Sequence, residues 1–222
     1  SSKEPGGPGP EEKRMIPLNA LAAFFTASVI LALAPGPDNI FVLTQSALYG
    51  RLSGIFIMLG LCTGLIVHTL AVAFGVAVIF QVSEIAFTGL KIFGACYLSY
   101  LAWQAFRAGS SEIASRANGK KSYGRLYRRG ILMNITNPKV SIFFLAFLPQ
   151  FADPARGPLT LQMMILGGVF ILATLLIFGG IALMAGSLGG WLGRSSKAQI
   201  IMNRVAGTVF ILLALKLATA RR

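Results

Sequence analysis

The chain has 222 residues, of which 55% are hydrophobic and 12% are charged, and its net charge is +13. Soluble domains carry about 25% charged residues, and a soluble protein this apolar would expose patches that aggregate. The composition therefore excludes an ordinary soluble domain and indicates a chain whose solvent is lipid.

The first segment, residues 1–14, is rich in proline, glycine and charge and has nothing to bury. A segment of this composition is expected to be disordered. Met15 directly precedes the apolar part of the chain. We therefore expect residues 1–14 to be an upstream extension that does not belong to the folded unit.

Six apolar segments follow, and a helix needs about 20 apolar residues to cross a bilayer. The uncharged runs at 52–83 and 157–193 are each ample for one crossing. Lysines near the ends of the shorter runs can reach the interface. The strands of a membrane barrel would alternate over about ten residues, which this sequence does not do. The prediction is an all-α membrane protein of about six transmembrane helices, over 18–48, 52–80, 85–107, 128–150, 160–187 and 199–219.

The long polar stretch between the third and fourth segments sets the expected organisation. From Arg107 to Arg129 it holds seven lysines and arginines against one acidic residue, and loops of this kind stay cytoplasmic. We expect a first three-helix half over 15–107, a basic cytoplasmic loop over 108–129 and a second three-helix half over 130–222. The N-terminus then lies outside, unless the first segment is re-entrant. Halves with an odd number of helices are inverted relative to each other, and inverted halves with broken helices are typical of transporters.

The first predicted helix is broken in its middle by the sequence PGPDN, which begins at Pro35. Pro35 and Pro37 each remove a backbone donor and clash with the preceding turn, and Gly36 lets the chain bend between them. Asp38 and Asn39 stand where a new half-helix begins and are favoured caps there. A carboxylate inside a membrane is by default a functional residue. The alternative is that Asp38 only caps the half-helix.

The first helix of the second half is broken by the sequence NITNPK, which begins at Asn134. Pro138 frees carbonyl groups of the preceding turn, and Asn134 and Asn137 supply polar groups to answer them. Lys139 brings a charge to this break. The alternative for Lys139 is an interfacial lysine that reaches lipid phosphates.

The two breaks together predict a site for a zwitterion. One charge at the centre of a bilayer costs about 2.5–3.5 kcal/mol, but opposite charges at matching breaks can offset each other across a hydrated cavity. Broken helices also offer backbone groups that bind a carboxylate and an ammonium. We expect Asp38 to face the ammonium of an amino acid, or a proton. Lys139 or a half-helix N-terminus would face the carboxylate.

The second predicted helix contains His68, the only histidine in the sequence, and a GxxxG spacing at Gly60 and Gly64. For His68 we expect a hydrogen bond within the bundle, with a proton relay as the alternative because histidine titrates near neutral pH. A lone histidine does not indicate a metal site. The glycines let helices approach closely, either within one bundle or, as the alternative, in a homodimer.

Motifs of soluble enzymes are missing from the sequence: it contains no GxSxG, no HExxH and no glycine-rich phosphate loop. We expect no enzymatic activity, no cofactor and no bound metal. Without an ATP site, transport would draw on an ion gradient or on exchange. The basic residues lie between apolar spans instead of on one folded face, so nucleic acid is not an expected partner.

At these motifs the sequence resembles the LysE/RhtB family of amino-acid exporters. The resemblance rests on PGPDN and NPK with their spacing and covers essentially all of 15–220. Supporting positions are Tyr49, Gly50, Arg51, Gly54, Gly60, Gly64, His68, Lys91, Gly94, Tyr97, Trp103, Asn134, Phe143, Phe144, Phe147 and Gln150.

The resemblance implies a multi-pass protein of the bacterial inner membrane that exports amino acids or their derivatives. Homoserine, threonine or other neutral amino acids are favoured as substrates, and proton antiport is the favoured coupling. The family's functional positions carried over are Asp38, Asn39 and 137–139. Relatives in the wider superfamily handle metal ions or move electrons through paired cysteines. Inorganic cation efflux and an electron carrier built on Cys62 and Cys96 are therefore alternatives, and a membrane scaffold that does not transport is a third.

Overall fold

The computed structural model describes residues 14–34, 36–76, 84–107, 122–194 and 196–219. Within these ranges the chain is helical with no strand, which confirms the predicted all-α class. Residues 1–13, Pro35 and most of the predicted basic loop lie outside the described residues. The elements are α1 (Leu18–Leu33), α2 (Pro37–Tyr49), α3 (Arg51–Ala71), η1 (Val72–Val76), α5 (Glu84–Arg107), α6 (Tyr123–Ile135), α7 (Pro138–Ile142), η2 (Phe143–Phe147), η3 (Leu148–Phe151), η4 (Pro154–Arg156), α8 (Leu159–Arg194) and α9 (Ser196–Thr219).

Two helical stretches of the described chain are long and apolar enough to cross a membrane alone: Arg51–Gly75, with a mean hydropathy of 2.3, and Leu159–Ala185, with 2.5. Two bent helix pairs pass the same test when each pair is taken together as one span. α1 and α2 meet at 62°, and α6 meets Pro138–Phe151 at 49°. Up to four spans are thus supported, and the six-helix topology stays a prediction. Both bends fall at the proline motifs where the sequence predicts broken helices.

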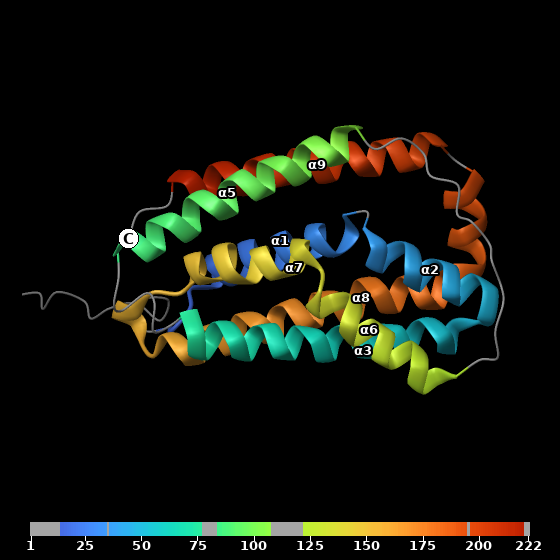
Figure 1. The fold of residues 1–222 in the computed structure, drawn as a ribbon, viewed down its shortest axis with the longest axis horizontal. Coiled ribbons are helices and arrows are strands. Elements are labelled where there is room, and N and C mark those ends of the chain that lie inside the picture. Colours follow the sequence, from blue (N-terminus) through green and yellow to red (C-terminus); the bar gives the residue numbers. More distant parts are fainter. Residues whose placement is uncertain (1–13, 35, 77–83, 108–121, 195, 220–222) are drawn as a thin grey trace, which may run out of the picture.

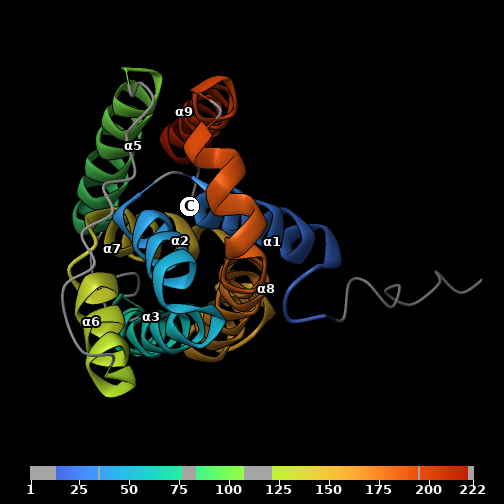
Figure 2. The ribbon, with the colours of Figure 1, turned by 90° about the vertical axis from the view of Figure 1, so that its right-hand side faces the viewer.

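The six helices α1, α2, α3, α6, α7 and α8 form a bundle, and α5 packs with α9 along one side of it (Figures 1 and 2). The side pair meets the bundle mainly through η2 and α1. Large apolar side chains remain exposed on the outer faces, for example Phe93 and Ile201 at 62% each. Such an apolar surface matches a lipid environment.

The interior consists of two apolar clusters. One is centred on the rings of Phe24, Phe143 and Phe147, and the other contains Ile57 and Phe178. The two helix breaks adjoin both clusters: Ala34 and Val140 belong to the first and Ala32 to the second.

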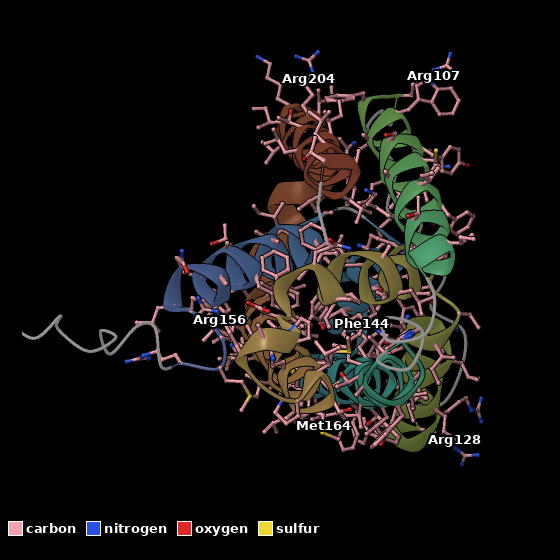
Figure 3. All side chains as sticks on the ribbon, turned by 90° about the vertical axis from the view of Figure 1, so that its left-hand side faces the viewer. Arg107, Arg128, Phe144, Arg156, Met164 and Arg204 are labelled. Atoms are coloured by element: carbon pink, nitrogen blue, oxygen red, sulfur yellow. The ribbon has the colours of Figure 1, made fainter. Side chains whose placement is uncertain are left out.

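The boundary of the basic segment differs from the expectation. α6 begins at Tyr123, so the last seven residues of the predicted loop are helical. Tertiary contacts hold this basic turn: the Tyr123 ring stacks on Phe56 at 4.8 Å between centroids, and the Arg129 guanidinium lies 4.4 Å from the centre of the Phe41 ring. Arg128 points away from the bundle (Figure 3). An arginine-rich sequence is typical of a loop, but here contacts with aromatic side chains on α2 and α3 stabilise this segment as the first turns of a helix.

The crossing of α3 and α6 depends on two glycines. A Cβ atom at Gly60 would lie 2.2 Å from the carbonyl oxygen of Tyr127, and one at Gly130 would lie 2.4 Å from the carbonyl oxygen of Ile57. Gly64, one turn along α3, also faces α6. The GxxxG spacing thus serves packing within the chain, and a homodimer stays a prediction.

We predict that Gly60→Ala lowers the thermal stability of the protein in detergent. The added methyl group forces two backbones apart, and overpacking of this kind costs about 1–3 kcal/mol. Gly168→Ala in α8 is the matched control, because nothing lies within 4 Å of the Cβ it would add. Equal melting temperatures for the two variants would contradict the close crossing.

Candidate functional site

The first break leaves carbonyl groups at the end of α1 without helical donors. The carbonyl of Leu31 would accept from the residue four positions on, but Pro35 has no N–H to donate. The side chain of Asn39 turns back from α2, and its Nδ2 donates to the carbonyl of Ala32 at 2.6 Å. Asn39 therefore caps the helix that precedes it, while Pro37 supplies the first residue of α2.

Lys139 provides the other donors at this break. Its Nζ donates to the carbonyls of Ala34 at 3.1 Å and Leu31 at 3.3 Å, and its side chain is buried. The ammonium thus sits on the C-terminal end of α1, where the helix dipole is negative. A Cβ at Gly36 would lie 3.1 Å from this Nζ, so glycine leaves room for the ammonium. Two of its three donors are engaged, and the expectation that Lys139 faces a substrate carboxylate stays a prediction.

Asn137 joins the second break to the first. Its Oδ1 accepts from the backbone N–H of Lys139 at 3.0 Å and so caps α7. Its Nδ2 donates to Oδ2 of Asp38 at 2.6 Å. Asp38 is 3% exposed, although it lies in the first turn of α2 at the end of a bend. One asparagine therefore orders its own half-helix and holds the carboxylate of the other.

The second break frees a carbonyl at Asn134, four residues before Pro138. This oxygen accepts from the backbone N–H of Asn137 at 3.0 Å and pairs with Nε2 of His68 at 3.2 Å. The His68 ring also lies 5.6 Å from the ring of Phe144, which is fully buried at the centre of the molecule (Figure 3). His68 is thus hydrogen-bonded within the bundle, and its role as a proton relay stays a prediction.

A small cavity lies between the two breaks. It has about 20 Å³ for the centres of water molecules, and about 10–15 Å³ is enough to hold one. Asp38, Asn134 and Lys139 line it. Oδ1 of Asp38 and Oδ1 of Asn134 are buried without a hydrogen-bond partner. Both atoms are acceptors that lack a donor, and both belong to residues that line the cavity.

The acid and the base share this cavity without touching. Among the described residues the ion pair within 4.0 Å is Arg156–Asp153, at 3.4 Å, so the Asp38 carboxylate and the Lys139 ammonium are farther apart than that. Each instead bonds to the other half of the chain, Asp38 to Asn137 and Lys139 to the end of α1. Proline motifs far apart in the sequence thus form one polar centre.

Part of the cavity wall comes from the second and fifth predicted helices, in which no site residue was predicted on this wall. Leu61 lies on α3, and Phe170, Thr174 and Phe178 come from one face of α8. Their i, i+4 spacing places them on one face of the helix. In the sequence, Thr174 is a single hydroxyl within a long apolar run, which is the one signal that could have identified this face.

Two of the alternatives to an amino-acid site find less support. Within the described residues no three side chains of histidine, cysteine, aspartate or glutamate gather into a cluster. Cys62 is a buried free thiol on α3, whereas Cys96 is an exposed free thiol on α5. Neither a multi-carboxylate metal site nor a cysteine pair is formed there.

Comparison with known proteins identifies the family of the chain and several relatives. The LysE type translocator family matches residues 29–221. The chain is 34% identical over 199 residues to a homoserine/homoserine lactone efflux protein of Salmonella typhimurium, covering 90% of this chain and 96% of that relative. It is 31% identical, with the same coverage, to an uncharacterized membrane protein of Vibrio cholerae. No solved structure matches.

We predict that Asn137→Ala destabilises the protein more than Asn137→Ser does. Serine can still cap α7 through its hydroxyl, whereas alanine loses both the cap, which contributes about 1 kcal/mol, and the bond to Asp38. A hydrogen bond to a charged group contributes about 1.5–3 kcal/mol. Thermal unfolding in detergent measures the order, and an unchanged melting temperature in Asn137→Ala would show that the link between the breaks is absent.

Proposed function

Because the chain belongs to the LysE type translocator family, we propose that it exports neutral amino acids or their derivatives by proton antiport. It is a multi-pass protein of the bacterial inner membrane. Relatives with the homoserine/homoserine lactone efflux activity that their names state cover nearly the whole chain. They support a small hydroxylated amino acid as the substrate, and we propose no enzymatic step.

The observation that carries this proposal is the unpaired Oδ1 of Asp38 inside the cavity. A buried acceptor without a partner costs about 1–3 kcal/mol, and more when it is charged. The α-ammonium of an amino acid carries three donors, and Asn134, which also lines the cavity, has a second unpaired buried acceptor in its Oδ1. The ammonium of the substrate would satisfy both oxygens.

The carboxylate of the substrate would lie towards Lys139, whose third donor is not used by the bonds to α1, or towards the N-terminal end of α2. Asp38 would take up a proton when the ammonium leaves, which gives the exchange of one substrate for one proton. An amino acid is larger than the cavity described above. Export therefore requires the two halves to move apart and widen it, as in alternating access.

We predict that Asp38→Asn lowers export at least tenfold and that Lys139→Ala also lowers it. Both variants remove a charge from the cavity, and a tenfold loss corresponds to about 1.4 kcal/mol. Export of labelled homoserine and threonine from overproducing cells measures the effect, with lysine as a test of the preference for neutral substrates. Asp153→Asn, at an exposed carboxylate outside the cavity, is the matched control. Wild-type export in both cavity variants would refute the site.

We predict that His68→Gln keeps export within about twofold of wild type, whereas His68→Leu loses it. The glutamine amide can still donate to the carbonyl of Asn134, but it cannot carry a proton in exchange. Proton-gradient-driven export in membrane vesicles measures the difference. If His68→Gln loses gradient-driven export while downhill exchange of substrate continues, His68 is instead a proton relay.

A further inference from the structure

We propose that the end of α1 and the cavity beside it form a binding site for a small monovalent cation, and that the Lys139 ammonium is its tethered occupant. The site is distinct in role from the substrate site: its cation is part of the protein and does not leave during transport. The first of the two tests below rests on the proposed transport function, whereas the second measures thermal unfolding and does not depend on transport.

The site is built from oxygen atoms. The carbonyls of Leu31 and Ala34 both accept from the Lys139 Nζ, at 3.3 and 3.1 Å. The carboxylate of Asp38 lines the same cavity and has an unpaired, buried Oδ1. The two carbonyl oxygens are ligands of the kind that a monovalent cation takes in a transporter. The Asp38 carboxylate, which is more than 4.0 Å from the ammonium, supplies a negative charge nearby.

The position of the site at the end of a half-helix also favours a monovalent cation. Carbonyl groups at the C-terminal ends of half-helices coordinate sodium ions in transporters with broken helices, because the helix dipole makes that end negative. Here the end of α1 is such a half-helix end, and a positive group already lies on it. A lysine delivers a compact point charge on a flexible stem, so it can reach this position from α7.

The tether determines what happens when the lysine is shortened. In Lys139→Ala the carbonyls lose their donor, Asp38 loses the nearby positive charge, and the volume of the lysine stem opens beside the oxygens. A free cation of suitable size then has both the room and the ligands. In Lys139→Met the unbranched side chain still fills that volume but brings no charge.

Transport in proteoliposomes gives the first test. K139A, K139M and wild type are compared in chloride salts of lithium, sodium, potassium and N-methylglucamine, the last being too large for the site. Wild-type transport should change less than twofold among these salts. K139A should be stimulated at least fivefold by one of the small cations relative to N-methylglucamine, and K139M should not respond. Equal transport by K139A in all four salts overturns the proposal.

Thermal unfolding of the purified variants without substrate gives the second test and does not depend on the transport function. The small cation should raise the melting temperature of K139A by about 3 °C or more, because a ligand that binds the native state stabilises it, and should leave wild type and K139M unchanged. Lys139→Ser is measured alongside, in case K139A is not recovered folded. Lack of a cation-specific shift in both shortened variants overturns the site. A shift in K139A, together with a wild type that exports no amino acid, would keep the cation site and reject the proposed function.

Discussion

A proline inside a membrane helix leaves a carbonyl group without its donor, and the bilayer core holds no water to replace it. The two bent helix pairs of this protein contain such breaks. Local donors satisfy part of each break, and the other half of the chain supplies the rest: Lys139 donates to the end of α1, and His68 pairs with the carbonyl of Asn134. The two breaks must therefore lie side by side, and the helices that carry them are positioned by this requirement.

The same requirement concentrates the polar chemistry of the molecule. Asp38 and Lys139 are buried between two apolar clusters, so each needs partners close by. Removing one partner of a buried charged pair typically costs about 3–5 kcal/mol. Because the bonds of both residues cross from one half to the other, any motion that separates the halves must exchange these bonds for new ones. A substrate with its own ammonium and carboxylate could supply the replacements, which links binding to movement.

The parts of this arrangement that depend on local chemistry could be predicted from the sequence. Proline and glycine at 35–37 and proline at 138 predict broken helices wherever they are packed, and the structure bends at both places. The shared location of Asp38 and Lys139 was also predicted, from the similarity of the two breaks. These features follow from residue types and their spacing alone.

The bonding partners could not be predicted, because they depend on contacts between distant segments. The Lys139 ammonium reaches carbonyls 105 and 108 residues away, and no local pattern marks a backbone carbonyl as its partner. The part of the cavity wall that α8 forms could not be predicted, because Phe170 and Phe178 are apolar residues like those of any membrane-spanning helix.

Proximity of the two breaks in the membrane is the central claim, and cross-linking tests it most directly. In a chain lacking Cys62 and Cys96, cysteines replace Asp38 and Asn137, and a protease site is inserted between the halves. A short bifunctional thiol reagent should then keep the halves together after cleavage. In the control, which carries cysteines at 38 and 153, the two halves should separate after cleavage. If both single cysteines react with the reagent but the 38–137 pair is never joined, the two breaks do not meet.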